Sequence, residues 1–287
     1  MSPDFSIFYR FYDVESNRGI RKVSMIKLIA SDIDGTLLPL GQRAIPAETM
    51  QLIEQLIDAG VVFSPCSGRQ IASIRRLFGP LAERCVPICD CGADSWLNGK
   101  PVHSLPMPRE IVNELLHDII AQPRCSAIAS GVDGALYAFK KDWDNEETEP
   151  SLHSSDMLPT RAPEDIPCDI LRVSAFCRDG GIAMAPMFEQ KWAPRGLNVA
   201  VGAPAWLDFS VADKALGLRS VCKALGIELS EVAAFGDSYN DLPMLRTAGQ
   251  PWLMSIARPE LQAEFQGHIC SDINAQLQRY LHEAQKQ

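Results

Sequence analysis

Residues 27–36 have the sequence Lys27-Leu28-Ile29-Ala30-Ser31-Asp32-Ile33-Asp34-Gly35-Thr36, in which a short apolar run leads directly into two aspartates. Successive side chains of a strand point to opposite faces, so Asp32 and Asp34 are expected to face one site from the end of a buried strand. Two carboxylates this close repel each other, and one of them takes up a proton unless a cation lies between them. The stretch therefore predicts a buried strand that ends at a cation-binding site, with an ordinary Asp-Gly turn as the alternative.

A calcium-binding loop of the helix-loop-helix type does not fit this stretch. Such a loop needs oxygen ligands at positions one, three and five, glycine at six and glutamate at twelve. Counted from Asp32, the chain has Thr36 at position five, Leu37 at six and Arg43 at twelve. The sequence excludes that class of site.

The segments around the stretch alternate between strand and helix patterns. Short apolar runs predict buried strands. Two runs with helical periodicity lie between them, of which the first begins at Pro46 and ends at Gly60, and the second ends at Gly79. This alternation is typical of a parallel α/β sheet. The expected strands are 26–30, 61–64 and 85–89, and the expected helices are 46–59 and 70–78.

The pattern changes after residue 93 and resumes near residue 213. The segments between these two points indicate α+β structure. They are a helix at 109–121, a hairpin of 125–130 with 135–139, an acidic loop at 142–149, a strand at 170–177 and a helix at 182–192. Segment 197–201 is expected to pair with 206–210. The alternation of helix and strand then resumes, with a helix from 213 to 225, a strand at 232–235, a helix at 243–248, a strand at 251–255 and a helix at 273–283. We therefore expect an α/β fold: a Rossmann-like parallel-sheet core domain (25–93 and 197–287), an inserted α+β cap domain (94–196), and an N-terminal lead-in (1–24) with no assigned role.

Polar residues collect where the predicted core strands end. Ligands bind outside the carboxyl ends of strands in open α/β sheets, so these residues are expected to meet at one edge. The candidates are Asp32 and Asp34 after the first strand, Ser67, Gly68 and Arg69 after the second, Asp237, Asn240 and Asp241 after the fourth, and Lys214 at the start of a helix.

This set of residues suits magnesium-dependent phosphoryl transfer. Asp32 is the candidate nucleophile, because a carboxylate needs no base to activate it. Asp34 can protonate the leaving oxygen and later activate water. The expected phosphate-binding groups are Ser67, Gly68, Lys214 and Asn240, with Ser67 and Lys214 also counted as catalytic. The expected Mg²⁺ ligands are Asp32, Asp34, Asp237 and Asp241, since a hard divalent cation prefers carboxylate oxygens.

Composition narrows the class of partner. The formal net charge of −9 argues against nucleic acid or an anionic membrane as a partner, because both favour basic surface. No apolar run approaches the length needed to span a bilayer. Nine scattered cysteines favour a reducing compartment, and we expect a cytoplasmic protein. A zinc site built from Cys85, Cys89, Cys91 and His103 is weighed against small buried residues beside a strand, and the second interpretation is favoured.

The ordered motifs resemble those of the haloacid dehalogenase superfamily of phosphotransferases, in particular the Cof-type hydrolases. The stretch 32–36 is similar to the family's first motif, with the nucleophile and the general acid in that order, and 67–69 to the second. Lys214 resembles the third-motif lysine, and residues 236–241 resemble the fourth motif. Two positions depart from the family pattern, since Cys91 and Ile256 each stand where the family often has asparagine.

The position of the insertion adds to this resemblance. Only ten positions separate Thr36 from Pro46, whereas 145 separate Arg69 from Lys214. In this superfamily, a cap between the second and third motifs is the mark of the sugar-phosphatase-like branch, whose cap selects the substrate. Five cap residues lie within the region that could contact the substrate, and none of them is assigned to the site: His103, Arg109, His117, Arg172 and Lys191.

The resemblance implies a Mg²⁺-dependent phosphatase that acts on a small phosphorylated metabolite, a sugar phosphate or a phosphorylated cofactor, through an aspartyl phosphate. Two alternatives stay open: a phosphomutase of the same fold, and a non-catalytic protein that binds a phosphometabolite. The sequence leaves the oligomeric state open.

Overall fold

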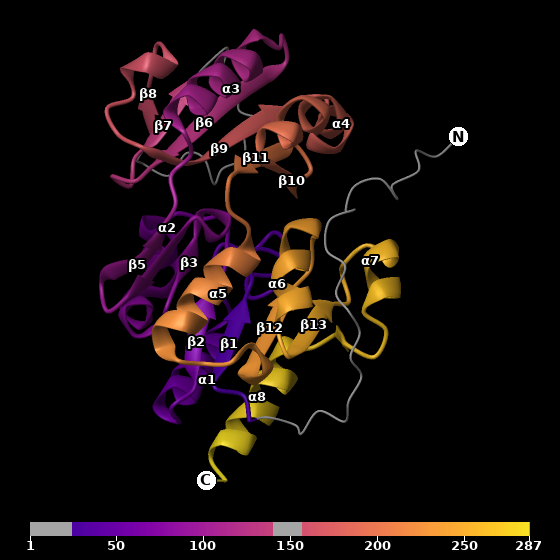
Figure 1. Cartoon of the computed structure of the whole chain (residues 1–287). Helices are drawn as coiled ribbons and strands as arrows, with labels where there is room; N and C mark the ends of the chain where they lie inside the picture. The colour runs from indigo at the N-terminus through magenta and orange to yellow at the C-terminus, as the bar shows by residue number, and fades with distance from the viewer. Residues whose placement is uncertain (1–24, 140–156, 287) are drawn as a thin grey trace.

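A five-stranded parallel sheet forms the centre of the larger domain, and β1 lies in its interior (Figure 1). The computed structural model describes residues 25–139 and 157–286, so the expected lead-in 1–24 and the acidic loop 142–149 lie outside the described residues. The strand order is β14-β13-β12-β1-β2. The strands are β1 (Leu28–Ser31), β2 (Val62–Pro65), β12 (Val232–Gly236), β13 (Gln250–Met254) and β14 (Ile269–Cys270).

Both faces of β1 are buried under helices. Leu28 and Ala30 pack in a cluster with side chains of α5 and α6, whereas Ile29 packs on the other face with α1 and α8. Burial of each such leucine or isoleucine contributes roughly 1.5–3 kcal/mol, which is why the strand is a continuous apolar run. The helices of this domain are α1 (Ala47–Asp58), α2 (Ile71–Phe78), α5 (Lys214–Leu225), α6 (Leu242–Thr247), α7 (Pro259–Glu264) and α8 (Ile273–Ala284).

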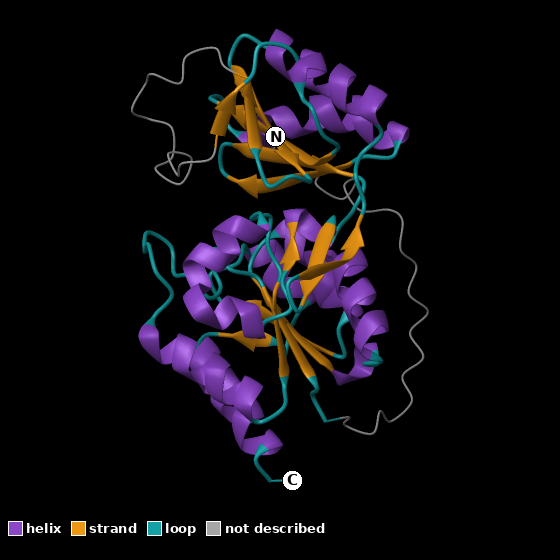
Figure 2. Cartoon of the chain, turned by 90° about the vertical axis from the view of Figure 1, so that its left-hand side faces the viewer, coloured by secondary structure: helices purple, strands orange, loops and turns teal. Residues whose placement is uncertain are grey.

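A six-stranded sheet with two helices forms the cap above the core (Figures 1 and 2). Its order is β10-β11-β9-β6-β7-β8, and helices α3 and α4 bury one face of it. The elements are α3 (Arg109–Ala121), β6 (Cys125–Gly131), β7 (Leu136–Phe139), β8 (Met157–Pro159), β9 (Ile170–Cys177), α4 (Gly181–Trp192), β10 (Asn198–Ala203) and β11 (Trp206–Ser210). The predicted fold class, a parallel-sheet core with an inserted α+β cap, is confirmed. In the parts of the chain that the structure describes, no helix is both long and apolar enough to cross a membrane.

The sheets place some strands on the other side of the expected domain boundaries. Strands β10 and β11 were expected in the core domain, but β11 pairs with β9 of the cap sheet. Segment 94–104 was expected in the cap, but it forms β4 (Asp94–Leu97) and β5 (Lys100–Ser104), which pair with the core strand β3 (Ile88–Cys89). The sheets therefore do not follow the boundaries at 93/94 and 196/197. No strands were expected at 94–104, and the expected pairing of 197–201 with 206–210 does not say which sheet these two strands join. We propose linkers near residues 105–108 and 211–213 instead.

The carboxyl of Asp94 in β4 lies almost buried, at 6% exposure. Burial raises its pKa to about 6, although a hydrogen bond from Trp96 Nε1 to Asp94 Oδ2 at 2.5 Å acts in the opposite direction. In the unfolded chain the pKa of aspartate is about 3.9, so the folded protein binds this proton more tightly. The proton therefore stabilises the fold fully at pH values below about 4, and this contribution is lost as the pH rises through 6.

Asp94→Asn is therefore expected to raise the free energy of unfolding by about 2 kcal/mol near pH 7.5 and by close to zero near pH 4. Asparagine stays neutral and can still accept the hydrogen bond from Trp96. Urea unfolding of both proteins at several pH values measures the difference, and Asp58→Asn on the exposed side of α1 is the control. A gain that did not change with pH would contradict this assignment.

Candidate active site

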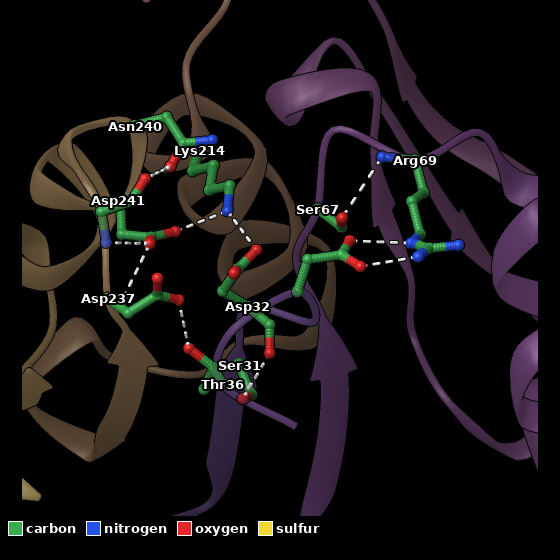
Figure 3. Close-up of polar contacts among 11 residues, drawn as sticks. Ser31, Asp32, Thr36, Ser67, Arg69, Lys214, Asp237, Asn240 and Asp241 are labelled. Carbon is green, nitrogen blue, oxygen red and sulfur yellow. Dashed lines mark hydrogen bonds and ion pairs between the residues drawn. The ribbon is translucent and has the colours of Figure 1, made fainter. Parts of the chain in front are cut away.

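The carboxyl ends of β2, β1 and β12 lie side by side, and each carries predicted site residues. The register pairs Ser31 with Pro65 of β2 and with Phe235 of β12, so the segments that follow these positions leave the sheet together. Asp32 follows β1 directly, and its amide donates to the carbonyl oxygen of Phe235 at 2.9 Å. Three stretches far apart in sequence thus meet at one edge, as expected from the parallel sheet (Figure 3).

Gly35 and Thr36 position Asp237 beside the end of β1. The Thr36 hydroxyl donates to Asp237 Oδ1 at 2.8 Å. Gly35 has φ +91°, and a Cβ at this position would lie 2.6 Å from Asp237 Oδ2. Only glycine combines this backbone conformation with so close an approach. The Asp-Gly-Thr turn is therefore shaped around the carboxylate of Asp237.

Lys214 is fully buried at the start of α5 and bridges two carboxylates. Its Nζ donates to Asp32 Oδ1 at 2.6 Å and to Asp241 Oδ1 at 2.5 Å (Figure 3). Burial alone would lower the pKa of Lys214, but the charges of Asp241 and Asp32 outweigh that effect and raise it well above its usual value. Asp213 caps the helix by accepting from the Leu216 amide at 2.8 Å, which fixes where Lys214 begins α5. The lysine is thus a permanent positive charge at the site.

Asp241 organises the loop after β12. Its Oδ2 accepts hydrogen bonds from the amides of Asp237 at 2.9 Å and Ser238 at 3.0 Å. A Cβ on Gly236 would lie 2.5 Å from the Cβ of Asp241, so the strand end fits closely against this side chain. Both oxygens of Asp241 are therefore occupied, one by Lys214 and the other by backbone amides. Asn240 accepts from the Ser238 hydroxyl at 2.8 Å.

Three carboxylates crowd around one lysine. Ligand oxygens of Asp32, Asp237 and Asp241 all lie within 4.8 Å of one another, and no other such group of His, Cys, Asp or Glu is found among the described residues. Burial raises the pKa of Asp32 well above its usual value, the charge of Asp241 adds to this, and Lys214 offsets part of it. Burial and Asp241 likewise raise the pKa of Asp237 to about 6. This excess of negative charge fits a divalent cation, and Asp32 and Asp237 are the residues best placed to hold it.

Asp34 does not join this group. Strand β1 ends at Ser31, so the alternation of side chains that predicted a shared face does not extend to Asp34. The Asp34 side chain is half exposed and forms a two-pronged ion pair with Arg69, with distances of 2.8 Å from Nε to Oδ2 and 2.6 Å from Nη2 to Oδ1. In the structure, the Asp34 side chain is therefore turned toward Arg69 and lies outside the group of Asp32, Asp237 and Asp241 that was expected to include it.

Ser67 and Gly68 form the loop after β2. Ser67 is buried, and its Oγ accepts from the Arg69 amide at 3.2 Å. Its carbonyl oxygen accepts from the amide of Cys91 at 3.1 Å. A Cβ on Gly68 would lie 3.2 Å from Cys91 Sγ, so Cys91 packs directly against this loop. The nine cysteines are all free, and the zinc interpretation gains no support.

Several polar residues near the site were not assigned to it from the sequence, and Arg172 was named only as a cap residue within the region that could contact the substrate. Asp90 of the core forms a buried ion pair with Arg172 of the cap, and Arg172 pairs in turn with Asp208, which also belongs to the cap. The Ser130 hydroxyl of the cap donates to Asp90 Oδ1 at 2.7 Å, and Gln70 of the core donates to Ser130 at 2.6 Å. One feature of the sequence could have pointed to these residues. Polar side chains recur at alternate positions of an otherwise apolar cap strand, as at Arg172 in β9.

Known proteins of one family resemble this chain over most of its length. The family model of the haloacid dehalogenase-like hydrolases matches residues 29–274. An HMP-PP phosphatase of Escherichia fergusonii is 26% identical over 263 residues, covering 84% of this chain and 88% of that protein. A 5-amino-6-(5-phospho-D-ribitylamino)uracil phosphatase of Escherichia coli K12 is 26% identical over 242 residues, covering 81% and 86%. A crystal structure from Eubacterium rectale matches with a TM-score of 0.72 and 28% identity, covering 90% of this chain and all of that one.

Proposed function

Because the chain belongs to the haloacid dehalogenase-like hydrolases, and is a phosphatase of that family, we propose that it hydrolyses a small phosphorylated metabolite through an aspartyl phosphate on Asp32. The observation that carries the proposal is the position of Asp32. Its Oδ1 is held by the buried Lys214 at 2.6 Å, while the side chain lies beside Asp237 at the open edge of the sheet.

Asp32 acts as the nucleophile. Since Lys214 holds Oδ1, Oδ2 is the oxygen that attacks phosphorus, and the bond from phosphorus to the ester oxygen breaks. Water then attacks the phosphorus of the aspartyl phosphate, which releases inorganic phosphate and restores the Asp32 carboxylate. Lys214 keeps its positive charge throughout and offsets the repulsion between the carboxylate and the phosphate.

Asp34 acts as the acid and base. It gives a proton to the leaving oxygen and takes one from the attacking water. Its side chain is paired with Arg69 in the structure, so the carboxyl has to leave Arg69 and turn toward the leaving group. Half exposure leaves it room to do so. Ser67, the Gly68 amide and Asn240 are proposed to bind the phosphoryl oxygens.

A divalent cation, which we propose to be Mg²⁺, fits between the carboxylates of Asp32 and Asp237. It would share Oδ1 of Asp32 with Lys214, so that Oδ2 stays free to attack phosphorus. When bound, it would neutralise carboxylate and phosphate charge at the site. We assign Asp241 a different role from the one expected, because both of its oxygens already hold Lys214 and the amides of the loop.

Asp237→Asn is expected to raise the Mg²⁺ concentration needed for half-maximal activity by at least about 100-fold, since even losing an outer partner of a metal ligand typically costs about 10- to 100-fold. Thr36→Val, which removes only the hydrogen bond to Asp237, should have a smaller effect. Titration of the chelated enzyme with Mg²⁺ measures both values, and the rise in thermal midpoint on adding Mg²⁺ provides a second readout. Equal Mg²⁺ requirements in all three proteins would contradict the metal assignment.

For the substrate, we propose a sugar phosphate or a phosphorylated cofactor precursor. The curated relatives act on HMP-PP and on a phosphoribitylamino uracil, as their names state, and both are small phosphorylated compounds.

A panel of such compounds, incubated with the enzyme and Mg²⁺, tests the proposed function through release of inorganic phosphate. We expect release from several of them. An isomerised product with little free phosphate would instead identify a phosphomutase. Binding without turnover across the panel would identify a non-catalytic protein.

A further inference from the structure

The cap sheet turns a polar face toward the core. Alternate residues of β9 face in opposite directions, so Val173 and Ala175 pack under α3 and α4 while Arg172 and Ser174 lie on the other face. Asp208 of β11 pairs in register with Ser174 and lies on that same face. This polar face lies over the core and carries Arg172 and Asp208, which makes it the part of the cap to consider for substrate contact.

One oxygen of Asp208 is held firmly by the cap itself. Asp208 Oδ1 accepts from the Ser174 hydroxyl at 2.6 Å and from Nη1 of Arg172. The Arg172 guanidinium is also 3.5 Å from Asp90 Oδ1 of the core. Only 12% of the Asp208 side chain and 13% of the Arg172 side chain is exposed. These contacts fix the orientation of the carboxylate.

The second oxygen faces the proposed phosphate-binding loop. A Cβ on Gly68 would lie 3.9 Å from Asp208 Oδ2, and a Cβ on Gly202 would lie only 2.4 Å from it. Within residues 25–139 and 157–286, the structure shows no hydrogen bond to this oxygen. Asp208 Oδ2 is therefore an acceptor that the cap holds immediately above the loop of Ser67 and Gly68.

We propose that Asp208 determines specificity by accepting, at Oδ2, a hydrogen bond from a hydroxyl or ammonium group on the leaving group of the substrate. This inference rests on the proposed function, because the phosphoryl group bound at Gly68 places its leaving group beneath Asp208. A carboxylate at this position favours leaving groups that carry a donor and disfavours those that carry a second anion there. Arg172 acts as a positioning residue through its contact with Oδ1.

The test compares substrates with and without a donor. The probes are p-nitrophenyl phosphate, whose leaving group carries no hydrogen-bond donor, glucose 6-phosphate with hydroxyl donors, and glucosamine 6-phosphate with an added ammonium group. The quantity measured is kcat/KM for a sugar phosphate divided by kcat/KM for p-nitrophenyl phosphate. We expect Asp208→Asn to lower this ratio by about 10-fold or more, as for loss of a hydrogen bond to a charged group. A larger fall for glucosamine 6-phosphate identifies the ammonium group as the donor, and an equal fall identifies a hydroxyl.

Gly202→Ala provides a second, independent variant. It keeps the carboxylate but places a methyl group against Oδ2, so it should lower the same ratio. Asp179→Asn is the matched control, because Asp179 is an exposed cap aspartate paired with Arg124. It should leave the ratio as in the wild type. Thermal unfolding of each variant reports whether the fold is retained.

Two results would overturn the inference. One is an unchanged ratio in Asp208→Asn, including the case in which both rates fall by the same factor. The other is a wild-type enzyme that hydrolyses p-nitrophenyl phosphate and neither sugar phosphate. Failure of the proposed function is distinguishable from both, since the wild type would then release phosphate from none of the three probes.

Discussion

Replacing Asp32 with asparagine is expected to reduce phosphate release by at least about 10⁴-fold, because the amide cannot attack phosphorus and no covalent intermediate can form. The asparagine side chain has nearly the same shape as that of aspartate, so the substrate should still bind. Initial rates of phosphate release, measured with each substrate that the wild type accepts, give the comparison.

The folded state should tolerate this substitution. Burial and the charge of Asp241 raise the pKa of Asp32, so the ionised carboxyl is costly where it lies, and a neutral side chain removes that cost. We therefore expect the free energy of unfolding without Mg²⁺ to be equal or higher in Asp32→Asn. Asp58→Asn, at an exposed ion pair with Arg84, is the control and should keep full activity. Appreciable turnover by Asp32→Asn would rule out Asp32 as the nucleophile.

Replacing Lys214 with methionine is expected to affect both activity and stability. The lysine is the one cation in contact with Asp32 and Asp241 among the described residues, and its removal leaves two buried carboxylates facing each other. Breaking a buried ion pair in this way typically costs about 3–5 kcal/mol of stability. The rate should fall by roughly 10²- to 10³-fold as well, because the phosphoryl oxygens lose a positive charge.

Chemical unfolding and steady-state kinetics of Lys214→Met measure the two effects. Lys223→Met is a matched control, because Lys223 is exposed on the same helix. A Lys214→Met protein with wild-type stability would show that the ion pairs with Asp32 and Asp241 contribute little to the fold.

The arrangement of the site follows from the strand ends, and these could be predicted. A buried strand was indicated by each of three apolar runs, those before Asp32, Ser67 and Asp237. Parallel pairing of these strands brings the three ends together. Asp34 was misplaced because the sequence does not show that β1 ends at Ser31. Beyond a strand end, positions two apart no longer share a face.

Residues that act across the domain interface could not be predicted. Asp208 was placed in the core domain because its strand pattern does not reveal which sheet β11 joins. The hairpin of β4 and β5 had a recognisable signal, since Asn98-Gly99 is typical of a two-residue turn and both residues have positive φ. Pairing between Asp90 and Arg172 depends on how the cap lies over the core, which no local pattern specifies.

The central claim is that Asp32 carries the phosphoryl group during turnover, and chemical trapping tests it most directly. The enzyme is mixed with Mg²⁺ and its best substrate, quenched in acid during the first turnover, and treated with borohydride, which reduces an aspartyl phosphate to homoserine. We predict homoserine at position 32 by peptide mass spectrometry, and none when substrate is omitted. An unmodified Asp32 together with homoserine at Asp34, Asp237 or Asp241 would contradict the account.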